Sequence, residues 1–362
     1  MNSEATAYKV PAPSMSPWQR LYGGGHRLRR AWYRRRASRL PRPVISVGNL
    51  HWGGTGKTPL TASIAARLRD QGRQVAILSR GYGSRGSGVR VVSTGSGPLL
   101  GPLAAGDEPV LLAGELQGVS VVVAADRYRA GQLALERLPT TPDVFLLDDG
   151  FSHVRLARDI DILVFPPDDP MAGGRLPPSG RLREPLTSVR HANAIVWSLP
   201  ERPTQAAGRR PDENAADWRP EELTAGLAQY GFTGRSFSSY TTVLPPTHKR
   251  QEPVPEGASV FLVTGIARPG RVAKALASLP YELVGSLAFP DHHSYPDESL
   301  RQIERAWRES GAAWVVTTGK DHVKLLGRLE TPLAELPLRA RPEEAFWSWL
   351  GSSLAQLDTE AS

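Results

Sequence analysis

Short apolar runs alternate with longer amphipathic stretches between residues 44 and 165. Apolar runs bounded by turn residues are typical of buried strands, whereas apolar residues recurring every three or four positions are typical of helices. Strands are predicted at 44–47, 74–78, 119–123, 144–147 and 160–165, and helices at 57–70, 108–116 and 127–138. This alternation predicts an α/β fold with a parallel sheet flanked by helices.

A second alternating region follows a polar stretch that is rich in Pro, Arg, Asp and Asn. Strands are predicted at 260–264, 283–288 and 314–317, and helices at 271–278, 298–310 and 343–354. A chain of 362 residues is long enough for two domains. The predicted organisation is an N-terminal segment at 1–40, a main domain at 41–200, a linker at 201–235 and a smaller α/β domain at 236–362.

Positive charge is concentrated near the N-terminus. The net charge is +8, but residues 5–69 hold 13 Lys and Arg and no acid, which leaves −4 for residues 70–362. Within 16–40, aromatic residues and leucines are interleaved with arginines, which predicts a basic amphipathic helix on an anionic membrane surface. The glycines at 23–25 predict a break in this helix, and residues 1–13 are expected to be disordered.

Two other interpretations of the basic segment are a solvated helix packed on its own domain and a nucleic-acid-binding arm. We favour the membrane surface, and expect no nucleic-acid partner and no obligate protein partner. No apolar stretch approaches the roughly 18 residues of a transmembrane helix, and no signal-peptide core is present, so a cytoplasmic protein is expected. The absence of cysteine excludes disulfides and Cys-ligated zinc or iron–sulfur clusters.

A glycine-rich segment, GGTGKT at 53–58, lies between a predicted strand and a predicted helix. Backbone N–H groups and the helix N-terminus bind nucleotide phosphates in such P-loops. Lys57 is expected to reach the β- and γ-phosphates of ATP, and the Thr58 hydroxyl to bind Mg²⁺. His51 stands where the usual pattern has its first glycine. The predicted nucleotide loop comprises His51, Trp52, Gly53, Gly54, Thr55, Gly56, Lys57 and Thr58.

Two carboxylates end the apolar strand predicted at 144–147. Asp148 occupies the position of a carboxylate that holds Mg²⁺ beside a P-loop, and Asp149 adds a second acid with an expected catalytic role. The alternative is an acidic turn or helix cap. Arg80 follows another strand at the carboxyl edge of the sheet, where ligands collect. It is predicted to neutralise phosphate charge, or else to be a surface arginine.

These segments together resemble the tetraacyldisaccharide 4′-kinases, the lipid A kinases of Gram-negative bacteria. The resemblance extends from about residue 17 to residue 325. It rests on VGNLHWGGTGKTP (47–59), SRGYG (79–83), GDEP (106–109), DRY (126–128), LLDDGFSH (146–153), RDIDILV (158–164), GRLPPSGRLREP (174–185), GIARPGR (265–271), FPDHH (289–293) and VVTTGKDHVKL (315–325). The family usually has Gln where Ser152 stands, Glu where Gly319 stands and Ala where His322 stands.

The resemblance implies a P-loop NTPase-type fold with a second, smaller α/β domain. It also implies ATP-dependent phosphorylation of the 4′-hydroxyl of a tetraacylated disaccharide 1-phosphate, giving lipid IVA for lipid A biosynthesis. Asp107 is then the expected general base, paired with His292 or, as second choice, His293. Glu108 is expected to assist at the metal. The implied location is the cytoplasmic face of the inner membrane, held peripherally by the N-terminal helix.

Asp107 and His292 are expected on different domains, so domain closure is predicted to complete the catalytic site. The substrate carries a 1-phosphate, and arginines are suited to bind it. The candidates for phosphate contacts are Arg80, Arg127, Arg181 and Arg183.

Two other functions remain possible at this level. A P-loop GTPase would need an N/T-K-x-D segment, which Gly319, Lys320 and Asp321 do not supply. A membrane- or DNA-associated ATPase switch would hydrolyse ATP without a phosphorylated lipid product. In such a switch the GDEP and DHH segments would have no role.

Overall fold

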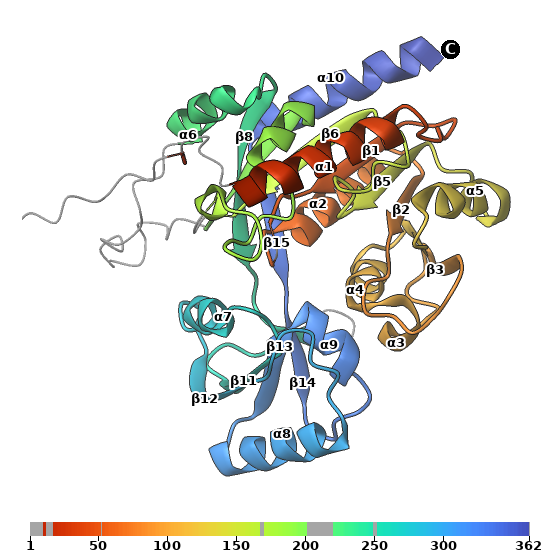
Figure 1. The fold of residues 1–362 in the computed structure, drawn as a ribbon. Helices are drawn as coiled ribbons and strands as arrows, with labels where there is room; N and C mark the ends of the chain where they lie inside the picture. The colour runs from red at the N-terminus through yellow and green to blue at the C-terminus, as the bar shows by residue number, and fades with distance from the viewer. Residues whose placement is uncertain are drawn as a thin grey trace, which may run out of the picture. The chain divides into compact units, whose positions relative to one another are not determined.

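The structure of the protein is a computed structural model. It describes residues 10–11, 17–51, 53–166, 170–200, 220–248 and 252–361 (Figure 1). Trp52, most of the expected disordered start and residues 201–219 of the expected linker lie outside the described residues.

The chain divides into two compact units. The first unit comprises 1–80, 124–241 and 340–362, and the second comprises 81–123 and 242–339. These units differ from the predicted domains at 41–200 and 236–362. The reason is that the chain leaves the first unit after Arg80, returns at Ala124, and returns again for its last helix. Such long-range returns leave no local signal in the sequence.

The first unit contains a parallel sheet, as predicted. Its strands lie in the order β8-β7-β6-β1-β5-β2, and neighbouring strands in this series are parallel. They are β1 (Val44–Gly48), β2 (Val75–Ser79), β5 (Val144–Asp148), β6 (Ile160–Phe165), β7 (Ala194–Pro200) and β8 (Arg235–Val243). Val47 lies opposite Asp148 in the β1–β5 register. The carboxyl ends of these two strands therefore meet at one edge of the sheet.

Helices pack on this sheet through their apolar faces. Helix α2 (Lys57–Asp70) contacts β1, β2 and β5, and buries Leu60, Ile64 and Leu68, which are spaced by one helical turn. Other helical segments of the unit are α1 (Pro17–Arg34), α5 (Arg127–Arg137), η1 (Ala172–Gly174), η2 (Leu186–His191), α6 (Pro220–Leu227), η4 (Ala228–Tyr230) and α10 (Glu344–Ala361). An ion pair between Arg73 and Asp358 joins the segment before β2 to α10.

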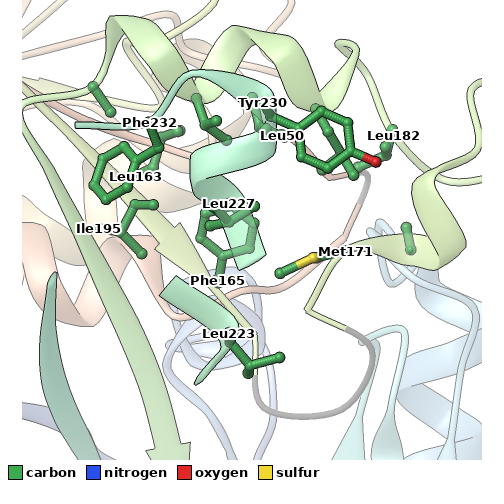
Figure 2. Packing of buried hydrophobic residues seen from close by; sticks show 14 of the residues in the cluster. Leu50, Leu163, Phe165, Met171, Leu182, Ile195, Leu223, Leu227, Tyr230 and Phe232 are labelled. Carbon is green, nitrogen blue, oxygen red and sulfur yellow. The ribbon is translucent and has the colours of Figure 1, made fainter. Parts of the chain in front are cut away.

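A large apolar cluster lies beside β6 and β7 (Figure 2). Phe165 and Trp197 are both essentially inaccessible to solvent, and their ring centroids are 5.0 Å apart. Leu223 and Leu227 of α6, which follows β7 in the chain, also belong to the cluster. This packing fixes the connections after β6 and β7, and thereby the loop at 174–185 that contributes to the site below.

Helix α1 is continuous, so the break predicted at 23–25 is wrong. Gly23 is buried, and an added Cβ would make ordinary contact with the Pro185 ring at 3.6 Å. The same helix face carries Arg30, which is 3% exposed and whose Nη1 lies 3.0 Å from Glu184 Oε2. Breaking a buried ion pair typically costs about 3–5 kcal/mol. These contacts attach α1 to the first unit.

The second unit contains a mixed sheet with strand order β10-β9-β14-β13-β11-β12. Its strands are β9 (Thr247–His248), β10 (Glu252–Pro253), β11 (Ser259–Thr264), β12 (Glu282–Ala288), β13 (Trp314–Thr318) and β14 (Leu333–Leu336). Its helices include α7 (Pro269–Leu276), α8 (Asp297–Ser310) and α9 (Gly319–Leu325). Strand β15 (Leu338–Pro342) then leads to α10. One apolar cluster contains Leu276 of α7 and another contains Ile303 of α8.

Residues 81–123 also belong to this unit. They form β3 (Arg90–Thr94), α3 (Pro102–Ala105), α4 (Asp107–Glu115) and β4 (Ser120–Val123). Strands β3 and β4 pair in antiparallel fashion, and α4 packs against α9. Strand β3 was not predicted, because its polar ends give it only a short apolar run.

Candidate active site

The loop between β1 and α2 has the geometry of a phosphate-binding loop. Gly56 is the N-cap of α2 and has φ +88°, a conformation that favours glycine, and an added Cβ would lie 2.8 Å from Ser198 Oγ. Asn49 Nδ2 donates a hydrogen bond of 2.9 Å to Thr55 Oγ1 and braces the loop. The predicted strand–loop–helix context is therefore present.

The loop presents open backbone rather than side chains. An added Cβ at Gly53 or at Gly54 would meet no atom within 4 Å. Lys57 and Thr58 begin α2 directly after the loop, where the helix dipole favours an anion. Amide groups, a dipole and an ammonium group at one place fit the phosphates of a nucleotide.

His51 lies at the start of this loop, where the usual pattern has glycine. It forms an antiparallel bridge with Leu182, and its ring packs edge-on against Phe165 with centroids 5.7 Å apart. The side chain is only 3% exposed. In this chain His51 thus joins the nucleotide loop to the loop at 174–185 through packing.

Asp148 lies at the carboxyl end of β5, beside the start of α2. It is 1% exposed, and Thr61 Oγ1 donates a hydrogen bond of 3.2 Å to its Oδ1. The Thr58 hydroxyl and the Asp148 carboxylate are both hard oxygen donors, the ligand type that Mg²⁺ prefers. The residues present therefore fit the predicted metal.

Asp149 connects the nucleotide loop with the loop at 174–185. Its Oδ1 lies 3.4 Å from Lys57 Nζ, and its Oδ2 accepts a hydrogen bond of 2.8 Å from Arg183 Nη1. Burial opposes ionisation, but Lys57 and Arg183 outweigh it and lower the pKa of Asp149 to about 2. Asp149 is consequently an anion held between two cations near neutral pH.

The four candidate arginines have different surroundings. Arg183 binds Asp149, as described above, and Arg127 is 5% exposed with Nη1 donating to the Ala125 carbonyl at 3.0 Å. Burial and the charge of Arg80 lower the pKa of Arg127 to about 10, so it remains protonated at neutral pH. Arg80, directly after β2, and Arg181 are exposed. The structure therefore separates two enclosed arginines from two accessible ones.

Asp107 and His292 face each other within the second unit. His292 Nδ1 lies 3.8 Å from Asp107 Oδ2. The expectation that they lie on different domains is wrong, because residues 81–123 belong to the same unit as residues 242–339. Both partners of the pair thus lie inside one unit.

Electrostatics favour the charged forms of both partners. Burial opposes ionisation of Asp107, but His292 and Lys324 outweigh it and hold its pKa below the usual value. Interaction with Asp107 raises the pKa of His292 against the effect of burial. His292 also has φ +60°, an unusual backbone conformation for a non-glycine residue. Backbone strain of this kind clusters at functional sites, where the surrounding structure holds the residue in place.

His293 has a different environment from its neighbour. Its ring stacks on Phe289 with centroids 4.7 Å apart, and its Nε2 lies 2.8 Å from Ser299 Oγ. Of the two histidines considered as partners of Asp107, the geometry thus selects His292.

Glu108 was expected to assist at the metal. Its carboxylate instead forms an ion pair with Lys320 of α9, and both residues belong to the second unit. Thr58 and Asp148 belong to the first unit. A role of Glu108 at the metal stays a prediction.

Several neighbours of Asp107 were not predicted as site residues. Lys324 Nζ lies 3.4 Å from Asp107 Oδ2, and the Tyr82 ring lies 5.7 Å from the His292 ring. Both occur inside segments that carry the family resemblance, SRGYG and VVTTGKDHVKL. That membership was a signal of importance, but only the tertiary contacts show that these residues adjoin the pair.

Comparisons with known proteins agree on one family. A family model described as tetraacyldisaccharide-1-P 4′-kinase matches residues 12–355. Tetraacyldisaccharide 4′-kinase from Geobacter sulfurreducens is 40% identical over 336 residues, which are 90% of this chain and 89% of that protein. The corresponding protein from Pelobacter propionicus is 40% identical over 333 residues, which are 90% of this chain and 86% of that protein.

A solved structure is similar over nearly the whole chain. It is the crystal structure of LpxK from Aquifex aeolicus in complex with ATP. The TM-score is 0.71 and the sequence identity 31%, and the similarity covers 94% of this chain and 97% of that one.

Proposed function

Since this chain belongs to the tetraacyldisaccharide 4′-kinase family, we propose that it transfers the γ-phosphate of ATP to the 4′-hydroxyl of a tetraacylated glucosamine disaccharide 1-phosphate. The products are ADP and lipid IVA, an intermediate of lipid A and hence of lipopolysaccharide. The observation that carries this proposal is the presence of two separate constellations in one chain. One is a phosphate loop with buried acids, and the other is an aspartate–histidine pair that a simple ATPase switch would not need.

The first unit supplies the nucleotide site. Amides of the loop and Lys57 bind the phosphates, and Thr58 and Asp148 would hold Mg²⁺. When bound, the ion neutralises charge on the phosphate oxygens. The Asp149 carboxylate pairs with the Lys57 ammonium and so limits the positions that the ammonium can adopt. Charge stabilisation of this kind is usually the largest catalytic contribution to phosphoryl transfer.

The second unit supplies the base. A sugar hydroxyl is a very weak acid, so its proton must be removed as the new O–P bond forms. Asp107 is ionised near neutral pH because its pKa lies below the usual value, so its carboxylate is free of a proton and can accept that of the hydroxyl. The bond between the γ-phosphorus and the bridging oxygen breaks in the same step, and ADP leaves with that electron pair. His292 holds the carboxylate in place.

The accessible arginines are the better candidates for the 1-phosphate of the substrate. Arg80 and Arg181 are exposed, whereas the guanidinium of Arg183 is engaged with Asp149. We assign Arg183 to positioning Asp149, and Arg127 to the charge balance beside Asp148 and Asp149.

The first helix supplies the membrane contact. Leu21, Leu28 and Trp32 are 70%, 75% and 50% exposed, and they follow one another along the outer side of α1. Arginines flank them, and each cation near an anionic surface contributes about 1 kcal/mol. No helix in the described part of the chain is long and apolar enough to cross a membrane. We assign the protein to the cytoplasmic face of the inner membrane as a peripheral protein.

The decisive test is phosphorylation of the lipid disaccharide with labelled ATP in detergent micelles. Asp107→Ala is expected to lower kcat by at least about 100-fold, the usual contribution of a general base, while ATP binding persists. Asp297→Ala is the matched control, because Asp297 also begins a helix of the second unit but is 84% exposed. Wild-type turnover by Asp107→Ala would refute the base, and ATP hydrolysis without labelled lipid would favour a switch.

A further inference from the structure

Lys324 is a buried lysine whose ammonium lies close to three oxygen atoms. Its side chain is 8% exposed, and Nζ lies 3.4 Å from Asp107 Oδ2 and 3.2 Å from Asp321 Oδ1. Nζ also donates a hydrogen bond of 3.0 Å to the His293 carbonyl. The ammonium thus makes one hydrogen bond, to a backbone carbonyl, and two ion-pair contacts with carboxylates. Burial of a lysine is costly unless it is paired in this way.

Asp321 is the fixed end of this arrangement. It is fully buried, and its Oδ2 accepts hydrogen bonds of 2.8 Å from the Gly265 amide and from Thr318 Oγ1. Two donors from two different strand ends therefore hold the Asp321 carboxylate. Lys324, one turn further along α9, is anchored to a rigid point and not to a mobile surface group.

The Asp107 carboxylate, at the other side of Lys324 from Asp321, is the proposed general base. It begins α4, while Lys324 lies on α9, and these two helices pack against each other. Lys324 Nζ and His292 Nδ1 both approach the same oxygen, Oδ2, at 3.4 and 3.8 Å. Because both partners approach Oδ2, Oδ1 is the carboxylate oxygen that remains for the acceptor hydroxyl.

We propose that Lys324 is a positioning residue for the base: it ties Asp107 Oδ2 to the Asp321 anchor, and so leaves Oδ1 to receive the proton of the acceptor hydroxyl. This inference rests on the proposed role of Asp107. Lys324 touches neither ATP nor the acceptor in this scheme. Loss of the Lys324 side chain should therefore lower kcat and leave the affinities for ATP and lipid nearly unchanged, because only the orientation of the Asp107 carboxylate changes.

The test exploits the absence of cysteine from the chain. Lys324→Cys introduces a single thiol, and 2-bromoethylamine alkylates it when the sulfur displaces bromide. The product carries an ammonium at nearly the length of lysine. Iodoacetamide, which installs a neutral amide of similar size by displacement of iodide, is the matched control on the same polypeptide.

The expected result is a kcat at least about tenfold lower for Lys324→Cys, with KM values for ATP and lipid within about twofold of wild type. Aminoethylation should restore most of kcat, and the neutral adduct should not. Lys324→Met should behave as the unmodified cysteine variant. Arg328→Met, which removes a cation near the end of the same helix that lies 3.8 Å from Asp297, should keep wild-type kcat.

Three results would overturn the inference. The first is a kcat within about twofold of wild type for Lys324→Met, and the second is equal rescue by the charged and the neutral adducts. The third is a loss that follows the thermal midpoint of each form instead of its charge. Asp107→Ala, assayed in parallel, separates the two proposals. If it is inactive while Lys324→Met is normal, only the positioning role fails, whereas an active Asp107→Ala removes the base itself.

Discussion

Two site residues have positive φ values, which residues other than glycine rarely adopt. Asp149 has φ +53° and His292 has φ +60°. Each such conformation costs on the order of 1–3 kcal/mol, so it persists only where neighbouring contacts compensate. For Asp149 the compensation includes Lys57 and Arg183. The strain therefore falls on two residues to which the proposed chemistry assigns direct roles.

Arg183 and Arg181 allow a residue-scale prediction from the same loop. Arg183→Met removes the guanidinium that binds Asp149 and should lower kcat by about tenfold, or about 1.4 kcal/mol, since a charge-assisted hydrogen bond is lost. Arg181→Met, two positions away and exposed, should raise KM for the lipid and leave kcat unchanged. Steady-state phosphorylation kinetics distinguish the two variants. A wild-type kcat for Arg183→Met would contradict the assigned positioning role.

At the scale of elements, α4, α9 and β14 meet around a pair of carboxyl groups. Burial and the nearby Glu335 raise the pKa of Glu115 to about 8, and burial raises that of Glu335 to about 7. His322 Nδ1 lies 3.5 Å from Glu335 Oε2, and Arg339 also acts on Glu115. Gly319 begins α9 here, and an added Cβ would lie 2.6 Å from Glu335 Oε1. A larger residue at this position would require the Glu335 or the Leu111 side chain to move.

The carboxyl pair predicts how stability depends on pH. Folded-state pKa values of about 8 and about 7 lie above the ordinary value of 4.5, so the folded protein binds more protons than the unfolded chain between these limits. Stability therefore falls as pH rises from about 5 to 8. Glu335→Gln should reduce this fall and raise Tm at pH 8 by about 2–4 °C, with little change at pH 5.

Thermal unfolding across this pH range measures the effect. Glu330→Gln, an exposed acid of the same unit, should leave the pH dependence of Tm as in wild type. A Glu335→Gln curve parallel to that of wild type would show that the pair does not share a proton.

At the scale of the whole molecule, charge and exposed apolar side chains coincide on α1. Residues 5–69 carry 13 cations and no acid, whereas residues 70–362 have net charge −4. Burying one leucine-sized side chain contributes about 1.5–3 kcal/mol, comparable with the contribution of two or three arginines at an anionic surface. The proposed membrane binding would draw on both contributions.

Vesicle binding provides the corresponding prediction. The double variant Leu28→Ser, Trp32→Ser should bind vesicles containing anionic lipid at least about tenfold more weakly, and salt should weaken binding of the wild type. Leu326→Ser, which changes an equally exposed leucine (63%) of the second unit, is the control and should bind normally. Unchanged binding of the double variant in a sedimentation assay would refute the membrane role of α1.

Much of the fold was predictable from local pattern. The helix at 57–70 and the strand at 160–165 were predicted with their observed bounds, because regular spacing of apolar residues specifies both type and length. The predicted break in α1 was wrong, because contacts of this helix with its own unit, such as the buried Arg30–Glu184 ion pair, outweigh the weak helix propensity of glycine. Among the site residues, Lys57 and Asp148 follow from a local motif, whereas the pairing of Asp149 with Arg183 does not.

The sequence by itself determined the α/β class, the nucleotide loop and the family, since each is encoded in residues close together in the chain. Tertiary structure alone decided that residues 81–123 join residues 242–339, that His292 and not His293 faces Asp107, and that Lys324 adjoins Asp107. The physical reason is that these contacts join residues far apart in sequence. Their formation depends on packing of whole helices and strands, which no local pattern records.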